Sequence, residues 1–448
     1  MGSDNLPWAV GGLLESTARA LHGDLADVQS VTRQPSLVAG VVREGRLVWT
    51  GARGTAVGSD GDLRPGPEVQ YRIGSITKMV TAVAVLQCRD EGLLDLGDPV
   101  GAHLGDVPFA SARVRDLLVH AAGLPAEPAG PWWERHDGGD FQMLVGQVLE
   151  QELVHPAGRR HHYTNLGFGL LGELLARLRG TSWTETVTER VLAPLGMTRT
   201  TYRPQAPHAQ GWSVQPYAGT LTPEPHSDTG AMAAAGQLWS TVQDLARYAA
   251  FWIDPDPAVL APSTVAEMCT PAVGEPGAGT EKVQGLGVRL YGRGERTLVG
   301  HSGSMPGFLA GFAVDPVRGT AGITLANATI GATPELALTL LDRLEDLEPP
   351  LPREWSPEPE VGGAAELLGT WFWGNTPMTF AIRDRHLVID HTNPGRRTRL
   401  VRESADTWRG LDHYFAGEQM RVLRDRDGGI THLDLVTYTL TRAPSTNP

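Results

Sequence analysis

The feature that most constrains the fold is a proline-dense segment, EPPLPREWSPEPEVGG, at residues 348–363. Proline fixes one backbone dihedral and lacks the amide donor that helices and sheets need, so this segment predicts a semi-rigid spacer. At 448 residues the chain is also too long for one ordinary hydrophobic core. We therefore predict two domains, residues 1–346 and 362–448, joined by a linker at 347–361.

The first predicted domain mixes strand-like and helix-like patterns. Its strand patterns come near the beginning, on both sides of a turn near Gly45, and again near the end, between residues 282 and 328. Its helix-like patterns lie at 8–22, 76–94, 113–120, 140–152, 165–179, 241–252 and 333–347. Strands that open and close the domain, with helices between them, predict an α+β fold with one antiparallel sheet and a helical part.

The second predicted domain has a different pattern. Residues 362–448 alternate short apolar and polar runs that are separated by turn signals. This alternation is typical of a small all-β barrel or sandwich.

Charge and hydropathy exclude several classes of partner. A net charge of −13, without any basic run, opposes nucleic-acid binding. No apolar run reaches the roughly 18 residues that suggest a membrane-spanning helix. The N-terminal stretch lacks the basic start and the continuous apolar core of a signal peptide. We therefore expect a cytoplasmic protein that binds neither nucleic acid nor a membrane.

Lysine is almost absent from this chain. Among the 38 residues that are Lys or Arg, only Lys78 and Lys282 are lysines. Arginine stays protonated at any workable pH, whereas a buried lysine loses its proton readily. If a helix begins at Ser75, then Ser75 and Lys78 lie on one face of its first turn. The amine could then activate the hydroxyl as a nucleophile, and the helix N-terminus would favour both a neutral lysine and a developing oxyanion.

A second motif is the run Tyr163-Thr164-Asn165. A polarised phenol near a lysine can relay the proton of the serine, and an asparagine amide can bind a substrate carbonyl. The same residues also suit an ordinary helix N-terminus, with Thr164 or Asn165 as its capping residue.

A third motif, His301-Ser302-Gly303-Ser304, precedes Pro306. In an edge strand it would line one wall of a cleft, where Gly303 lets a ligand approach the backbone. His301 is also consistent with a structural polar residue at a strand end. The run almost matches Gly-x-Ser-x-Gly, which would make Ser302 the nucleophile of an α/β-hydrolase. Its last position is Ser304, however, and a strand-like run follows Pro306 where such a nucleophile must open a helix.

In order and approximate spacing, these three motifs resemble those of serine β-lactamase-like and penicillin-binding-protein-like enzymes. The segments RDEGLLDLGDPV, LLVHAAGLP, LAPLGMTRTTY and GQLWSTVQDLARY are also similar to that family. The resemblance covers residues 10–345 and is closest to the branch of class C β-lactamases, carboxylesterases and D-amino-acid peptidases.

The resemblance implies a role for each matching residue. Ser75 would be the acylated nucleophile, and Lys78 and Tyr163 would share the work of general base and acid. Asn165 would contact the substrate, and the N–H groups of Ser75 and Ser304 would form the oxyanion hole. The substrate would be a small ester or a peptide, without a cofactor or a metal ion.

The third motif departs from the β-lactamase pattern. β-Lactamases of this family usually carry Lys-Thr-Gly there, whereas this chain has His301-Ser302-Gly303. A permanent cation is thus replaced by a residue that is largely neutral at pH 7. This difference disfavours antibiotic hydrolysis and favours the esterase and D-peptidase branches, with His301 among the catalytic residues.

The C-terminal domain resembles the lipocalin-like domain of some of these peptidases and of peptide-cyclising thioesterases of similar architecture. In those proteins the barrel covers the cleft and limits substrate length. Arg442, near the end of the last predicted strand, would then be able to reach a substrate carboxylate. A solvated arginine at a strand end is the ordinary alternative.

Three functions follow from these patterns. The first is a serine hydrolase of esters or of (D-)peptides and amides, and the second is a thioesterase that cyclises or releases peptides. The third is a non-catalytic ligand-binding protein on the same fold. Zinc hydrolysis is poorly supported, because the histidines that include His161 and His162 lack a His-Glu-x-x-His pattern.

Overall fold

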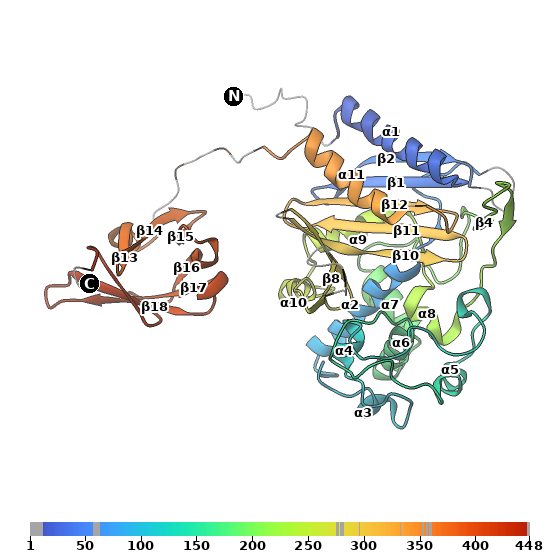
Figure 1. The fold of residues 1–448 in the computed structure, drawn as a ribbon, viewed down its shortest axis with the longest axis horizontal. Coiled ribbons are helices and arrows are strands. Elements are labelled where there is room, and N and C mark those ends of the chain that lie inside the picture. The colour runs from blue at the N-terminus through green and yellow to red at the C-terminus, as the bar shows by residue number, and fades with distance from the viewer. Residues whose placement is uncertain are drawn as a thin grey trace. The chain divides into compact units, whose positions relative to one another are not determined.

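The chain divides into two compact units, and the division follows Pro350, inside the proline-dense segment. The structure is a computed structural model, drawn in Figure 1. It describes residues 12–56, 63–274, 277, 282–294, 296–331, 333–351, 354, 357 and 361–445. Across these ranges, each helix is too short or too polar to cross a lipid bilayer.

An antiparallel sheet forms the centre of the first unit, with eight strands among the described residues. Its order from edge to edge is β2 (Arg46–Gly54), β1 (Ser36–Arg43), β12 (Thr320–Ala326), β11 (Phe308–Asp315), β10 (Arg296–Met305), β9 (Arg289–Arg293), β8 (Lys282–Gln284) and β7 (Val273–Gly274). Strands from both ends of the sequence meet at β1 and β12, as the α+β pattern predicts. In β1 almost every residue is buried, because helices cover both faces of the sheet.

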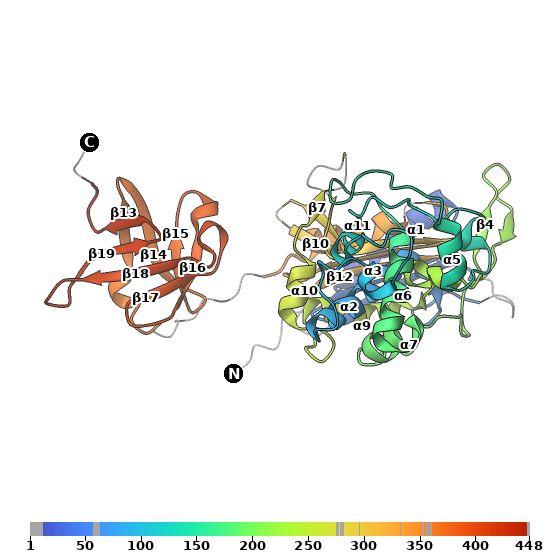
Figure 2. The same cartoon turned by 90° about the horizontal axis from the view of Figure 1, so that it is seen from below.

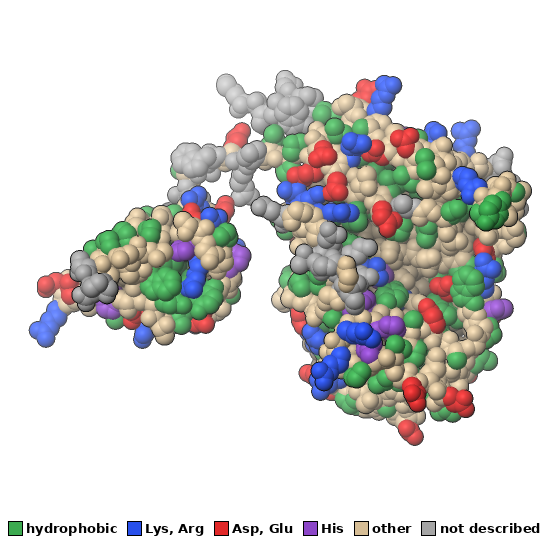
Figure 3. Space-filling view, in the orientation of Figure 1, with side chains coloured by type: hydrophobic (Ala, Val, Ile, Leu, Met, Phe, Trp, Pro, Cys, Tyr) green, Lys and Arg blue, Asp and Glu red, His purple; other side chains and the backbone are tan. Residues whose placement is uncertain are grey.

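Two helices that are distant in the sequence cover one face of the sheet, namely α1 (Glu15–Thr32) and α11 (Thr333–Leu347). Leucines of both helices pack on alternate residues of β1, which all point to this face. On the outer surface Arg343 donates two hydrogen bonds of 2.9 Å to Asp24. Acidic and basic side chains are interspersed over this part of the molecule (Figure 3).

The first helix differs from its predicted range of 8–22. Residues 8–11 lie outside the described residues, and α1 runs from Glu15 to Thr32. Gly23 is exposed and does not end the helix, because Leu21 and Leu25 on either side of it are fully buried against the sheet. Tertiary packing thus outweighs the roughly 1 kcal/mol that glycine costs inside a helix.

The opposite face of the sheet carries the helical part of the unit (Figures 1 and 2). Its central helix is α2 (Thr77–Asp90), in which every residue from Thr77 to Cys88 is buried. Around it lie α3 (Gly101–Leu104), α4 (Val114–Leu118), α5 (Phe141–Val148), α6 (Leu166–Arg179), α7 (Trp183–Val187), α8 (Ala233–Gly236), α9 (Val242–Ile253) and α10 (Pro262–Met268). The α2 helix therefore connects the sheet to the helical part, and its N-terminus lies where the two meet.

The second unit is a closed antiparallel barrel in which neighbours in sequence are neighbours in space. Its strands are β13 (Gly369–Trp373), β14 (Thr376–Arg383), β15 (His386–Asp390), β16 (Thr398–Arg402), β17 (Thr407–Gly410), β18 (Gln419–Arg424), β19 (Ile430–Leu435) and β20 (Tyr438–Thr441). The pairing of β13 with β20 closes the barrel. The core contains the buried side chains of Trp371, Phe380, Trp408 and Phe415.

Candidate active site

The predicted nucleophile lies at the start of the central helix. The short strand β3 (Tyr71–Arg72) leads into a 3-10 turn, Gly74–Ile76, and α2 follows directly. Gly74 has a φ of +49°, in the left-handed region that glycine adopts without strain. Its neighbours in this turn are buried, but Ser75 is partly exposed. The turn therefore presents the Ser75 hydroxyl at the surface of an otherwise buried segment.

The third motif packs directly against this turn. A Cβ atom on Gly74 would come within 2.5 Å of the backbone nitrogen of Ser304, and one on Gly303 would lie 1.9 Å from the carbonyl oxygen of Ile73. Only glycine at both positions allows the backbone of β10 to approach the turn so closely. The backbone of Ser304 thus lies beside that of residue 74, next to Ser75, and the role of its N–H group in an oxyanion hole stays a prediction.

The Lys78 amine contacts the Ser75 hydroxyl. Its Nζ lies 3.0 Å from Ser75 Oγ, 2.6 Å from Asn165 Oδ1 and 2.6 Å from the carbonyl oxygen of Ala235. A neutral amine has two hydrogens and one lone pair. It can donate to the two acceptors that have no hydrogen of their own, Asn165 Oδ1 and the Ala235 carbonyl. Its lone pair then faces the hydroxyl proton of Ser75.

Burial makes this neutral form accessible. The Lys78 side chain is fully buried, and burial lowers its pKa to about 7. The negative charges of Glu127 and Glu134 oppose this effect, while the positive charge of Arg289 adds to it. At neutral pH a substantial fraction of the amine is therefore able to accept a proton.

Tyr163 lies beside the same amine. The Lys78 Nζ is 5.1 Å from the centroid of the phenol ring. Burial raises the pKa of Tyr163 to about 12, although a hydrogen bond with Ser75 opposes the shift. Tyr163 is thus a neutral phenol near pH 7, so it is suited to relay a proton and not to act as a resting tyrosinate.

The Asn165 amide connects Lys78 to a carboxylate that the motifs did not reveal. Asn165 Oδ1 accepts from Lys78, and its Nδ2 donates to Glu127 Oε1 at 2.6 Å. The other oxygen of Glu127 accepts from the Trp133 indole at 2.6 Å. Burial raises the pKa of Glu127, while these hydrogen bonds and Lys78 lower it. Glu127 lies in a Pro- and Gly-rich loop, where no sequence pattern identifies it.

His301 is buried on β10, near the phenol. Its Nδ1 lies 2.5 Å from the carbonyl oxygen of Ser302, which only a protonated Nδ1 can satisfy. Burial, followed by the charges of Arg289 and Lys78, holds the pKa of His301 well below its ordinary range. The ring centroids of His301 and Tyr163 are 6.0 Å apart. His301 therefore faces the site as a neutral imidazole.

A permanent cation nevertheless lies close by, on the next strand. Arg289 of β9 pairs with Gly300 of β10, and its guanidinium carbon is 5.3 Å from the centroid of the Tyr163 ring. The prediction that a largely neutral His301 replaces a permanent cation considered only the third motif. It missed Arg289 because the sheet register, which the sequence does not reveal, places that residue beside the motif.

Ser302 lies on β10 between His301 and Gly303, and three further residues named above do not belong to the three motifs. Arg442 belongs to the barrel, where it donates to the carbonyl oxygens of Glu366 at 2.7 Å and Leu368 at 2.9 Å and stacks 4.0 Å from the Trp371 ring. Its contact with a substrate stays a prediction. His161 and His162 lie in a loop, where His161 is buried.

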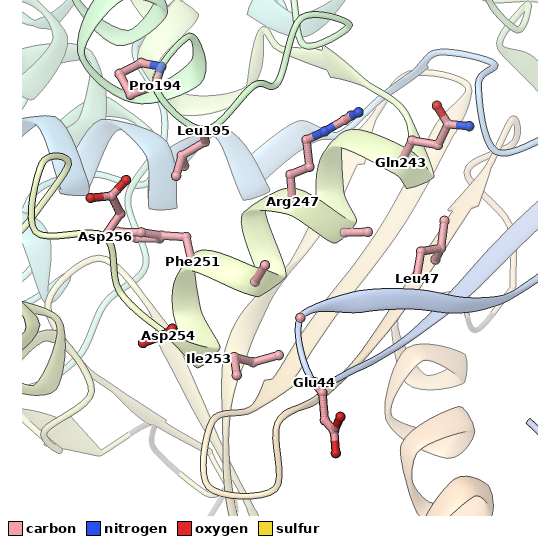
Figure 4. Close-up of a pocket in the computed structure, with 13 residues that line it drawn as sticks. Glu44, Leu47, Pro194, Leu195, Gln243, Arg247, Phe251, Ile253, Asp254 and Asp256 are labelled. Carbon is pink, nitrogen blue, oxygen red and sulfur yellow. The ribbon is translucent and has the colours of Figure 1, made fainter. Parts of the chain in front are cut away.

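Two cavities of the first unit are separate from the motifs. The cavity in Figure 4 has a volume of about 720 Å³ and lies between α9 and the β1–β2 turn, with Glu44 and Arg247 in its lining. Another, of about 830 Å³, lies beside α8 and includes Tyr202. Within the described ranges, no three His, Cys, Asp or Glu side chains are grouped to hold a metal ion.

An antiparallel sheet with a helical part, and a serine that contacts a buried lysine where they meet, define a recognised class of protein. The Beta-lactamase family profile matches residues 25–346, and the chain belongs to that family. Residues 361–442 match a domain of unknown function, DUF7586.

Individual relatives agree with this assignment. "Beta-lactamase-like protein 2" of Dictyostelium discoideum is 29% identical over 250 residues, which cover 53% of this chain and 45% of that protein. The chain thus matches less than half of that relative's length. The structure of the octameric penicillin-binding protein homologue from Pyrococcus abyssi is 22% identical, with a TM-score of 0.66, and the match covers 96% of this chain and 100% of that one.

A second solved structure covers the first unit. A D-stereospecific amidohydrolase from Streptomyces sp. is 26% identical, with a TM-score of 0.60, over 72% of this chain and 96% of that chain. The α+β fold, the β-lactamase-like family and the C-terminal barrel expected from the sequence are therefore confirmed.

Proposed function

We propose that this protein is a serine hydrolase that forms an acyl-enzyme on Ser75 and acts on esters or on D-amino-acid amides and peptides. The observation that carries the proposal is the 3.0 Å contact between Ser75 Oγ and the Nζ of a lysine whose pKa is about 7. Such a pair supplies a nucleophile and its general base, which an ordinary buried lysine does not.

The proposed first step is acylation. Lys78 Nζ takes the proton of Ser75 as Oγ attacks the substrate carbonyl, and the oxyanion forms beside the backbone N–H groups of Ser75 and Ser304. Tyr163 then passes a proton to the leaving alcohol or amine as its bond to carbon breaks. The acyl group is then esterified to Ser75. In the second step the acceptor gives its proton to Tyr163 as it attacks this ester, and Lys78 returns its proton to Ser75 Oγ as the acyl group is released.

Two observations support this substrate class. His301 is neutral, so the third motif offers no fixed charge of the kind that grips the carboxylate of a β-lactam antibiotic. The Streptomyces amidohydrolase, which is D-stereospecific, is similar to this chain over its first unit. Both observations favour esters and D-amides over β-lactams as substrates.

A thioesterase that cyclises or releases peptides is the second candidate. The observation that favours it is the closed barrel that follows the catalytic unit, as the resemblance to such enzymes implies. The two candidates share the acyl-enzyme and differ in the acceptor, which is water in one and an internal amine in the other.

The test is intact-mass detection of an acyl-enzyme with p-nitrophenyl esters, D-amino-acid amides and peptide thioesters. We expect a mass increase equal to the acyl group on the wild type and on Ser302→Ala, and none on Ser75→Ala. Cyclic product from a thioester would favour the second candidate. A folded wild type that gains no mass and no label from a fluorophosphonate probe would favour the non-catalytic ligand-binding alternative.

A further inference from the structure

His120, in the segment LLVHAAGLP, is a buried histidine to which the proposed chemistry assigns no role. It follows α4, its side chain is fully buried, and its φ of +55° lies in the left-handed region. Histidine occupies this region less readily than glycine or asparagine do. The surrounding structure must therefore hold this residue in place.

Three contacts connect His120 to the second motif and to the residue that precedes it. Its carbonyl oxygen accepts from the His162 N–H at 2.7 Å, and its Nδ1 accepts from the Thr164 N–H at 3.1 Å. The ring centroids of His120 and Tyr163 are 4.3 Å apart, with 32° between the ring planes. A single residue thus fixes the backbone on both sides of Tyr163 and packs against its phenol ring.

These contacts fix the tautomer of His120. A backbone N–H can only donate, so Nδ1 must present its lone pair and the proton must be on Nε2. Nε2 is buried and has no hydrogen-bond partner among the residues described. The rings of His161, Tyr163 and Phe168 pack against His120. The titratable groups that act on it electrostatically are Lys78, His161, His301 and Arg289, and none of these is acidic. Burial, reinforced by these groups, holds the pKa of His120 well below its ordinary range, so the accepting tautomer persists.

We propose that His120 is a positioning residue for Tyr163: its Nδ1 lone pair and its ring hold the phenol in place beside Ser75 and Lys78. The inference rests on the proposed acyl-enzyme function, in which Tyr163 relays a proton. A histidine that merely filled space would need only its volume and not a lone pair at Nδ1.

Two substitutions separate these roles. His120→Asn tolerates the left-handed backbone and places an amide oxygen near the position of Nδ1, whereas His120→Gln places its amide near the position of Nε2. His120→Phe keeps a ring but leaves the Thr164 N–H without an acceptor. His155→Asn is the matched control, because His155 is also buried but its ring contacts His162 and not Tyr163.

The readout is the rate of Ser75 labelling by a fluorophosphonate probe in the full-length chain, measured beside the melting temperature. We expect His120→Phe and His120→Gln to label about 10- to 100-fold more slowly, and His120→Asn and His155→Asn to stay within about fivefold of the wild type. If His120→Phe fails to fold, the labelling rates of His120→Asn and His120→Gln decide whether the acceptor at Nδ1 is needed. Equal rates for Asn and Gln, or a wild-type rate for a folded His120→Phe, would overturn the inference.

A double-mutant cycle tests whether His120 acts through Tyr163. In a Tyr163→Phe background the His120→Gln substitution should slow labelling by less than about threefold, because the group that it positions is gone. A full and independent loss in that background would overturn the assignment. A wild type that does not label at Ser75 would instead defeat the proposed function, so the two failures are distinguishable.

Discussion

At the scale of single residues, the pKa of Lys78 sets a measurable pH dependence. The base must be neutral to take the proton of Ser75, and burial lowers its pKa to about 7. We therefore expect the rate of Ser75 labelling to rise about tenfold per pH unit below pH 7 and to level off above it. Labelling rates measured between pH 5.5 and 9, with a stability control at each pH, test this.

Replacing the base while keeping a charge supplies the control. Above pH 7, Lys78→Arg should lose about 10²–10⁴-fold, as Lys78→Ala should, because a guanidinium does not give up its proton. Substantial activity in a folded Lys78→Arg variant would remove Lys78 from the role of base.

The neutral His301 leads to a prediction about antibiotics. We expect weak or absent hydrolysis of nitrocefin beside clear hydrolysis of a short-chain p-nitrophenyl ester, because nitrocefin carries a carboxylate and His301 offers no charge. Any nitrocefin turnover that remains should fall roughly tenfold or more in Arg289→Gln, the approximate worth of one charge-assisted hydrogen bond. The ester rate, measured well above the pKa of Lys78 so that the base is neutral in both proteins, should change much less. Comparable turnover of both substrates by the wild type would contradict this prediction.

At the scale of elements, the close approach of β10 to the turn at Gly74 is the contact that assembles the site. A Cβ atom at position 303 would lie 1.9 Å from the Ile73 carbonyl oxygen, so Gly303→Ala must push the two segments apart. We expect a loss of about 1–3 kcal/mol in unfolding free energy and a labelling rate at least tenfold lower. Denaturant unfolding and probe labelling together measure both effects.

A matched glycine provides the comparison. Gly146 lies within α5, and a Cβ atom there would meet nothing within 4 Å. Gly146→Ala should leave labelling unchanged and raise stability slightly, since alanine favours a helix more than glycine does. If Gly303→Ala behaved in the same way, the proposed packing constraint would be wrong.

The sequence predicts elements and local motifs better than it predicts contacts between them. Ser75 and Lys78 are neighbours on one turn, so their contact follows from spacing alone, and α11 occupies its predicted range of 333–347. Glu127 and Arg289 reach the site through loop conformation and strand register. Tertiary packing sets the loop conformation and the strand register, so no local sequence pattern identifies Glu127 or Arg289.

At the scale of the whole molecule, all three motifs lie in the first unit. A chain that ends at Pro350 keeps Glu348, whose carboxylate accepts hydrogen bonds of 2.9 Å from the Leu14 N–H and from Arg43. We expect this truncated chain to label at Ser75. We also expect its activity on large peptides to change more than its activity on small esters. Probe labelling and a panel of substrates of increasing length measure this.

The truncation needs a folding control, for which circular dichroism and a cooperative melt are suitable. A well-folded truncated chain without labelling would mean that the barrel contributes to the active site. Arg442 would then be the first residue to mutate.

The scarcity of lysine also turns the proposed base into its own spectroscopic reporter. Selective isotope labelling of lysine would place a label at only two side chains, those of Lys78 and Lys282. The Lys78→Arg variant would assign the two resonances by removing one of them. Titration of the assigned Lys78 signal in the wild type by NMR would then read the protonation of its amine directly, before any substrate is known.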